Sequence, residues 1–261
     1  MNRLTGKSVV VVGGGIGGLA AALRLRRAGC RVTVLEKNAT VGGKVAERKA
    51  NGFRWDLGPS LFTMPQILDR LFSDLGEKRE DYLSLLPLSP ACRYRWADGY
   101  QFDENEFFWS RPDSARLLHH AEGLYQLSAT AFLESDPSEI WRQILNPALL
   151  PLLRYLPAMS PFRSLASASR HFYSDPHLQQ FLQRFATYNG SDPELTPATF
   201  AVIPYVQARF GGWYIRGGIR RLAEALLRLI EKHGVEIQTA AEVQSIDPTG
   251  VTLASGKKIP A

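Results

Sequence analysis

The sequence lacks most of the features that mark secreted, metal-binding or membrane-spanning proteins. Its 261 residues include only two cysteines, Cys30 and Cys92, which are too few for a disulfide framework or a cysteine metal cluster. We expect both to be reduced thiols in or near the core. No run of eighteen apolar residues occurs, so no continuous transmembrane helix is predicted. The first residues show no signal-peptide pattern, and we therefore expect a cytoplasmic protein.

The charge is unbalanced toward basic residues, with a formal net charge of +6. A basic surface is compatible with nucleic acid or with an anionic membrane. The arginines are scattered and no nucleic-acid-binding motif occurs, so we expect no nucleic-acid partner. Residues 144–162 are rich in leucine but carry four prolines, which forbid a continuous helix. This segment either packs inside a helical subdomain or forms a peripheral membrane contact on the cytoplasmic face.

The start of the chain is typical of a strand, a glycine turn, a helix and a second strand. Ser8–Val12 is a short valine-rich run, as expected of a buried parallel strand. Residues 13–18, Gly-Gly-Gly-Ile-Gly-Gly, follow at once and fit the G-x-G-x-x-G pattern. Apolar residues then recur at helical spacing until Gly29, where a helix is expected to stop, and residues 31–36 are typical of a strand. This order predicts a parallel β-α-β unit.

The glycine turn is the candidate phosphate-binding loop. In such loops the first glycine permits a tight turn, the second lets backbone N–H groups approach a pyrophosphate, and the third lets the helix pack on the strand. The residues that we assign to the cofactor here are Gly13, Gly15, Ile16, Gly17 and Gly18. Glu36 closes the second strand, at the spacing where an acidic side chain accepts hydrogen bonds from a ribose. A merely structural turn is the alternative.

A second glycine pair follows the ribose acid and bears on the choice of dinucleotide. Residues 42–43 are both glycine, and Lys37 and Lys44 flank the segment. A simple nicotinamide domain has no need of this segment, whereas a longer cofactor, held again beyond the first helix, does. We therefore assign Lys37, Gly43 and Lys44 to the cofactor. The alternative is an ordinary loop with a solvated lysine.

These motifs together resemble the two-dinucleotide-domain flavoproteins, the group that contains amine oxidases and carotenoid desaturases, where G-G-[RK] follows the ribose acid. Residues 52–60, Gly-Phe-Arg-Trp-Asp-Leu-Gly-Pro-Ser, resemble a stretch of the phytoene desaturases. Residues 212–218, Gly-Trp-Tyr-Ile-Arg-Gly-Gly, are similar to the family's segment near the flavin ring. Residues 186–193 also resemble the desaturases, including the hydroxycarotenoid branch. The resemblance covers nearly all of the chain.

The resemblance implies FAD as the cofactor and adds contacts to it. It assigns Gly58, Pro59 and Ser60 to the cofactor, places Arg216 near the flavin ring, and uses the backbone of Val243 to hold the adenine. The implied reaction removes two hydrogens from a saturated carbon–carbon bond of an apolar polyene, such as phytoene or a hydroxycarotenoid, with hydride passing to the flavin. The terminal electron acceptor stays unassigned.

No catalytic residue can be assigned from the sequence. Asp56 and Glu242 are the nearest carboxylates in the matched motifs, and each is interpreted as structural or cofactor-orienting. The five histidines have no partners at metal-ligand spacing, so we interpret them as solvated and expect no metal. Two alternatives stay open: a flavin amine oxidase, which shares the first two glycine motifs, and a prenyl-lipid-binding protein of the same fold without redox function.

The predicted fold class is α/β, with a Rossmann-like FAD-binding domain and an inserted, largely helical α+β substrate domain. Residues 1–90 form the first part of the FAD domain, 91–204 the substrate domain and 205–261 the second part of the FAD domain. We expect a hairpin around residues 98–99 and helices over 114–136 and 176–187. Desaturases of this family continue for a comparable length, so the resemblance implies that this chain is truncated and has little activity alone. The chain is then a fragment or a truncated gene product, or its missing C-terminal half is a separate chain.

Overall fold

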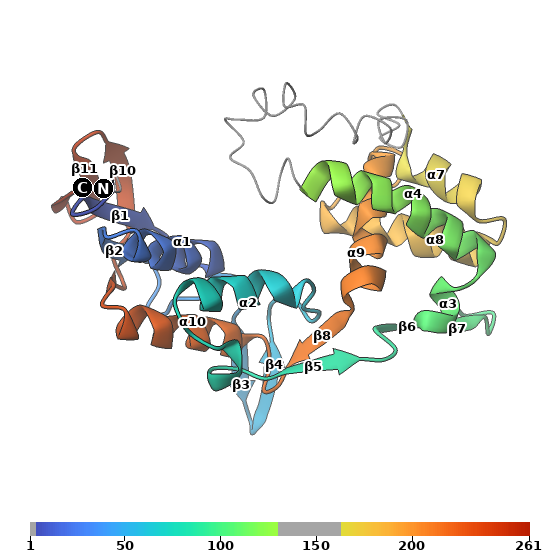
Figure 1. Cartoon of the computed structure of the whole chain (residues 1–261), viewed down its shortest axis with the longest axis horizontal. Helices are drawn as coiled ribbons and strands as arrows, with labels where there is room; N and C mark the ends of the chain where they lie inside the picture. Colours follow the sequence, from blue (N-terminus) through green and yellow to red (C-terminus); the bar gives the residue numbers. More distant parts are fainter. Residues whose placement is uncertain (1–3, 130–162) are drawn as a thin grey trace. The chain divides into compact units, whose positions relative to one another are not determined.

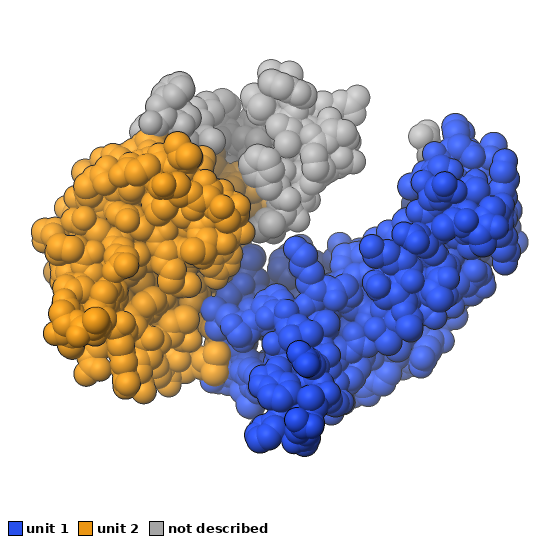
Figure 2. Space-filling model, turned by 180° about the vertical axis from the view of Figure 1, so that it is seen from behind, with its two compact units in different colours: residues 1–87, 213–261 blue, residues 88–212 orange. Residues whose placement is uncertain are grey.

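The computed structural model describes residues 4–129 and 163–261 of the chain. They form two compact units, which Figure 2 colours separately: unit 1 consists of residues 1–87 and 213–261, and unit 2 of residues 88–212. Unit 2 thus interrupts unit 1 in the sequence. The sequence analysis placed these divisions after residues 90 and 204. The second differs because residues 205–212 pack with unit 2.

Unit 1 contains the predicted parallel β-α-β unit (Figure 1). Strand β1 (Ser8–Val12), helix α1 (Ile16–Arg27) and strand β2 (Arg31–Leu35) follow one another, and β1 pairs with β2 in parallel, Ser8 opposite Arg31. Strand β9 (Glu236–Gln238) adds to the other edge of β2, also in parallel, which gives the order β1-β2-β9. The third strand of this sheet is therefore contributed by a segment about 200 residues later in the chain.

The core of unit 1 lies between α1 and helix α10 (Arg220–Lys232), which run close together in Figure 1. Both helices place leucines at helical spacing on one face, and Leu19, Leu23, Leu226 and Leu229 are fully buried. Gly234 follows α10 with φ +67°, a conformation that favours glycine, and so marks the helix end. This packing fixes the start of α1, where the glycine turn lies.

The remaining elements of unit 1 are short strands and one further helix. They are the hairpin β3 (Glu47–Ala50) and β4 (Phe53–Asp56), helix α2 (Pro65–Asp74), the 3-10 turn η1 (Arg79–Asp81), the paired strands β5 (Leu85–Leu88) and β8 (Gly212–Ile215), and the antiparallel strands β10 (Val243–Asp247), β11 (Gly250–Leu253) and β12 (Lys258–Pro260). Strands β11 and β12 pair in antiparallel.

Unit 2 is largely helical in its described residues and includes the hairpin of β6 and β7. Its elements are β6 (Cys92–Arg95), β7 (Gln101–Glu104), α3 (Glu106–Trp109), α4 (Pro112–Ser128), α7 (Leu165–Phe172), α8 (Pro176–Gln183), η5 (Arg184–Tyr188), η6 (Ala198–Ala201) and α9 (Val202–Phe210). The hairpin turns at residues 98–99 as predicted. The helix predicted over 176–187 is α-helical only to Gln183 and continues as a 3-10 helix.

Some sequence expectations fall outside the described residues. The proline-interrupted apolar segment, 144–162, lies there entirely, and so does the end of the helix predicted over 114–136. Within residues 4–129 and 163–261, no helix combines the length and the apolar character needed to cross a membrane.

Candidate cofactor site

The glycine turn between β1 and α1 has the geometry that its sequence predicts. Gly13 adopts φ +99°, and its N–H donates to the carbonyl oxygen of Leu35 at 2.7 Å, which ties the turn to β2. A Cβ on Gly18 would lie 2.0 Å from the oxygen of Gly13, so only glycine lets the helix approach the turn. A Cβ on Gly15 would meet no atom within 4 Å. The space beside Gly15 is therefore open.

The first turn of α1 is suited to an anion. Gly15 is the N-cap residue, no side chain caps the helix, and no acidic residue lies in its first turn. Arg24, Arg26 and Arg27 lie in the last turn, where cations interact favourably with the helix dipole. Backbone N–H groups at such a terminus bind phosphate well. The open cradle and the uncapped terminus fit the diphosphate of a dinucleotide.

The second glycine pair packs directly against the first motif. The N–H of Gly42 donates to the oxygen of Gly14 at 2.7 Å, and Gly15 and Gly42 form a parallel bridge. A Cβ on Gly43 would lie only 3.2 Å from the Cα of Gly15. The guanidinium of Arg220 donates to the carbonyl oxygen of Val41 and so holds this segment from α10. The glycine turn and the second glycine pair therefore form one continuous candidate site.

Glu36 is buried, with 5% of its surface exposed, and both of its carboxylate oxygens already accept hydrogen bonds from the chain. The N–H of Gly14 donates to Oε2 at 2.8 Å, while the N–H and side-chain amide of Asn38 donate to Oε1 at 2.9 and 2.6 Å. Burial raises the pKa of this carboxyl, but these donors outweigh burial and hold the pKa below its usual value. A carboxylate has about four lone-pair sites, so capacity for a ribose hydroxyl remains.

Asp56 joins two motifs that are far apart in the sequence. It accepts a hydrogen bond from Arg54 Nη1 at 2.6 Å and one from the backbone N–H of Ile219 at 3.3 Å. A Cβ on Gly218 would lie 2.1 Å from Arg54 Nη1 and 2.6 Å from Asp56 Oδ1, so a side chain there would have to displace the ends of these two side chains. The interpretation of Asp56 as a structural residue agrees with these contacts.

The segment after β4 continues this junction. Phe62 and Trp213 exchange backbone hydrogen bonds at 2.9 and 2.8 Å. A Cβ on Gly58 would lie 2.2 Å from the carbonyl oxygen of Lys44, which places the third motif against the second. Lys44, Pro59 and Ser60 are exposed. The glycine turn, the second glycine pair and the segment of residues 52–60 therefore all lie within unit 1, where each contacts the next.

The other predicted cofactor residues have simpler surroundings. The side chains of Lys37 and Arg216 are exposed, and the N–H of Arg216 donates to the oxygen of Ser84 at 2.9 Å. Val243 begins β10, close after Ala241, whose N–H donates to the carbonyl oxygen of Glu36 at 2.9 Å. The strand proposed to hold the adenine thus starts beside the proposed ribose acid. The roles of these residues toward a cofactor stay predictions.

Sequence reasoning missed two residues of this site, Arg220 and Asn38. Arg220 lies on α10, 179 residues after the Val41 carbonyl that it holds, and nothing in its local sequence marks it. Asn38 lies only two residues after Glu36, so its contact with this acid is local in the sequence. Glu242, the other carboxylate considered, is exposed.

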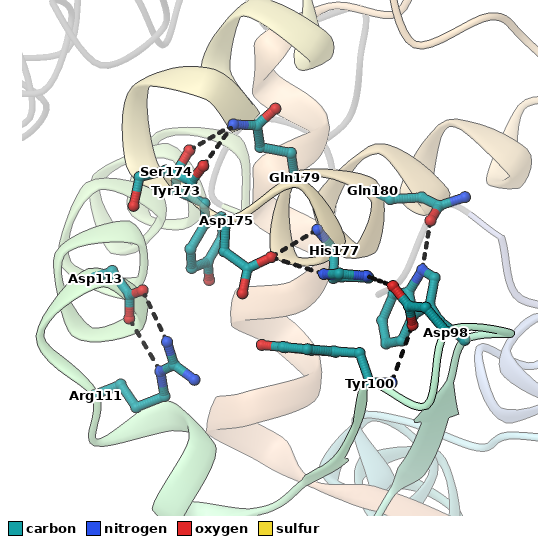
Figure 3. Close-up of polar contacts among 11 residues, drawn as sticks. Asp98, Tyr100, Arg111, Asp113, Tyr173, Ser174, Asp175, His177, Gln179 and Gln180 are labelled. Carbon is teal, nitrogen blue, oxygen red and sulfur yellow. Dashed lines mark hydrogen bonds and ion pairs between the residues drawn. The ribbon is translucent and has the colours of Figure 1, made fainter.

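One histidine in unit 2 departs from the prediction that all are solvated. Figure 3 shows the His177 ring between two carboxylates: Nε2 lies 2.7 Å from Asp98 Oδ2 and Nδ1 lies 3.0 Å from Asp175 Oδ1. Tyr100 stacks on the ring at 4.1 Å. The hydrogen bond to Asp98 is the main reason that the pKa of His177 is raised. Among the described residues, no group of three or more histidine, cysteine and acidic side chains is placed to hold a metal ion.

Comparison with known families places the chain among flavoproteins. Residues 16–261 match the family described as "Flavin containing amine oxidoreductase". This range begins inside the glycine turn, after Gly15, and includes the second and third motifs.

Curated relatives are similar along almost the whole chain. The 1-hydroxycarotenoid 3,4-desaturase of Flavobacterium sp. is 34% identical over 96% of this chain and 54% of its own length. The 4,4'-diapolycopene oxygenase of Methylomonas sp. is 34% identical over 100% of this chain and 55% of its own. The hydroxyneurosporene desaturase of Cereibacter sphaeroides is 36% identical over 97% and 54%. The resemblance to carotenoid desaturases is confirmed, and the chain spans about half the length of these relatives.

Solved structures of the same fold are also found. A protein from Pyrococcus furiosus superimposes with a TM-score of 0.64 at 23% identity, over 97% of this chain and 57% of its own. Putrescine oxidase superimposes with a TM-score of 0.61 at 20% identity, over 98% and 56%. At these identities the likeness shows the fold alone.

Proposed function

Because the chain belongs to the family of flavin-containing amine oxidoreductases, we propose that it acts as an FAD-dependent carotenoid desaturase. The reaction would remove two hydrogens from a saturated carbon–carbon bond beside a conjugated polyene. The names of the relatives that align along its length, carotenoid desaturases and a carotenoid oxygenase, support this substrate class.

The observation that carries the proposal is the joined glycine site of unit 1. The open cradle at Gly15, the uncapped start of α1 and the packing of Gly42 on Gly14 suit a long dinucleotide whose diphosphate needs main-chain donors. Glu36 is already charged and held in place for a ribose hydroxyl. When bound, FAD supplies the hydride acceptor, and the residues of the chain position it.

The protein groups that take part in the chemistry are few. Asp56 is occupied by Arg54 and Ile219, so it orients the backbone near Gly218 instead of accepting a proton. Glu242 is exposed, and we assign neither carboxylate as the proton acceptor. A hydrocarbon offers no polar handle, so binding depends on buried apolar area, worth roughly 25 cal/mol per Å².

Unit 1 has a row of exposed apolar side chains, which is a candidate surface for binding a partner. Phe53, Trp55 and Leu57 alternate along and just beyond β4, with exposed fractions of 67, 47 and 61%. Contiguous exposed apolar surface marks an interaction site. We propose that a further polypeptide covers this row, corresponding to the part of the relatives that lies outside the matched region. The expected membrane contact on the cytoplasmic face likewise stays a proposal, and its segment lies outside the described residues.

The test combines cofactor and substrate binding. We expect purified protein to retain FAD, seen as flavin absorbance, and to bind neurosporene in detergent micelles. Colourless protein that still binds the polyene would contradict the redox proposal and favour the prenyl-lipid-binding alternative. Anaerobic bleaching of the bound flavin by putrescine, without any response to the polyene, would favour the amine oxidase alternative.

A further inference from the structure

Unit 2 contains a buried polar cluster that the proposed function does not use. It consists of Glu104 at the end of β7, Gln207 on α9 and Arg184 at the start of η5, joined through Tyr94 on β6. Glu104 and Gln207 are 2% and 3% exposed. Charged and amide side chains are rarely buried this deeply without a full set of partners.

The four side chains form one hydrogen-bonded network. Tyr94 donates to Glu104 Oε2 at 3.1 Å, and Arg184 Nη2 donates to the Tyr94 hydroxyl at 2.8 Å. Gln207 Nε2 also donates to Glu104 Oε2, at 3.5 Å. Oε2 of Glu104 thus accepts from both Tyr94 and Gln207, and the network links four elements of unit 2: β6, β7, η5 and α9.

Three polar atoms of this network have no partner. Glu104 Oε1, Gln207 Oε1 and Arg184 Nε are buried without a hydrogen bond within the described part of the chain. Two of them belong to side chains that are at least 97% buried. Unpaired buried groups are costly, so their concentration in one network points to a group that the protein alone does not supply.

The chemistry of the unpaired atoms selects the ligand. A hydroxyl both donates and accepts, so it can donate to an oxygen of Glu104 or Gln207 and accept from Arg184 Nε–H. A carboxylate or phosphate only accepts and would face two unpaired acceptors. Burial raises the pKa of Glu104, since the charged form is disfavoured away from water, and a neutral ligand adds no further charge to this buried site.

The surroundings are apolar and aromatic. Tyr94 stacks on Phe102 at 4.8 Å and meets Phe181 edge-on at 5.1 Å, and Arg184 lies over the ring of Phe185 at 4.5 Å. Toward solvent, Cys92 is half-buried and Tyr188 is 57% exposed. A hydroxyl reaching this network would therefore be attached to an apolar chain.

We propose that Glu104, Gln207 and Arg184 bind the hydroxyl end group of a hydroxylated polyene and thereby select it over the plain hydrocarbon. This inference rests on the proposed function, since it takes the polyene as the substrate. Two relatives carry names that specify hydroxylated substrates, the 1-hydroxycarotenoid 3,4-desaturase and the hydroxyneurosporene desaturase, which agrees with this selection. Residues that hydrogen-bond a substrate hydroxyl discriminate against the analogue that lacks it.

The experiment compares the binding of hydroxyneurosporene and neurosporene in detergent micelles, followed by quenching of tryptophan fluorescence. We expect the protein to bind the hydroxylated compound about tenfold more tightly. In Gln207→Leu, which keeps the size of the side chain but removes its acceptor and its donor to Glu104, the two affinities become equal while neurosporene binds as before. Glu104→Gln provides a second variant, and Gln183→Leu, outside the network, is the matched control with the preference retained.

The outcomes separate the two proposals. Equal binding of both polyenes by the unsubstituted protein would overturn the hydroxyl site, leave the polyene proposal standing, and indicate a bound water only. A preference that Gln207→Leu and Glu104→Gln both retain, with unchanged melting temperatures, would also overturn the site. Failure to bind either compound would contradict the proposed function itself.

Discussion

The carboxylate of Glu36 accepts a hydrogen bond from the backbone N–H of Gly14 at 2.8 Å, across 22 residues of sequence. The acid that follows β2 therefore holds the glycine turn, in addition to the role toward a ribose that we propose for it. A loop that is fixed before the cofactor binds loses less conformational freedom on binding. We therefore expect preorganisation of the turn by Glu36 to contribute to cofactor affinity.

Glu36→Gln should lower the free energy of unfolding and make that free energy depend less on pH. A neutral amide accepts hydrogen bonds more weakly than a carboxylate, so we expect the free energy of unfolding at pH 7 to fall by about 1–2 kcal/mol. The folded-state pKa of Glu36 lies below the unfolded value of 4.5, so its contribution is complete above that pH and is lost as pH falls through the folded pKa.

Urea unfolding at about pH 7 and about pH 3 measures this difference. The gap between Glu36→Gln and the unsubstituted protein should narrow at the lower pH. The exposed Glu242→Gln is the control, with little effect at either pH. An equally large gap at both pH values would show that the charge of Glu36 is not what stabilises the turn.

Gly15→Val should separate cofactor binding from folding. The backbone at Gly15 has φ −71° and its Cβ would meet no protein atom, so we expect the fold to survive while the side chain occupies the place of the diphosphate. The measurements are flavin absorbance of the purified protein and its melting temperature. Gly18→Ala is the contrasting variant, because its Cβ would collide with the oxygen of Gly13 and should lower the melting temperature. If Gly15→Val retained flavin normally, the assignment of this loop as the diphosphate-binding site would be wrong.

Gly218→Ala should destabilise unit 1 more than Gly217→Ala. Both glycines have positive φ, +96° and +87°, so both substitutions strain the backbone, by about 1 kcal/mol or more. The Cβ at Gly218 would also displace the hydrogen-bonded ends of Arg54 and Asp56, at 2.1 and 2.6 Å, whereas the one at Gly217 comes no nearer than 3.1 Å to the side chain of Arg221. Denaturant unfolding of the two variants tests this, and equal losses would mean that the Asp56 junction tolerates the methyl group.

His177 should make the stability of unit 2 depend on pH near neutrality. Its pKa is raised above the ordinary value of 6.5 by Asp98 and Asp175, so the ion pairs stabilise fully below that value and are lost as pH rises through the folded pKa. We expect the melting temperature of the protein to fall, relative to His177→Gln, between about pH 5.5 and pH 8.5. His119→Gln, at an exposed position, should follow the unsubstituted protein. Parallel curves for all three proteins would exclude the His177 contacts as the cause.

Local sequence determined the elements around the cofactor site, because short-range rules govern them. The valines of β1, the spacing of Gly13, Gly15 and Gly18 and the stop at Gly29 predicted the β-α-β unit that the structure contains. The requirement for glycine follows from close approach within a few residues, as at Gly18 against Gly13. Contacts between residues so close in the chain can be predicted from the local sequence.

The tertiary structure alone decided which of these segments meet. The sequence placed Glu36 at the end of β2 but could not show that its oxygens bond Gly14 and Asn38, nor that Asp56 bonds Ile219, 163 residues later. Burial of Glu104 and Gln207 in one network likewise depends on packing between β7 and α9. The physical reason is that long-range contacts depend on how amphipathic helices and strands bury their apolar faces, and a periodic pattern gives the face of an element but not its partner.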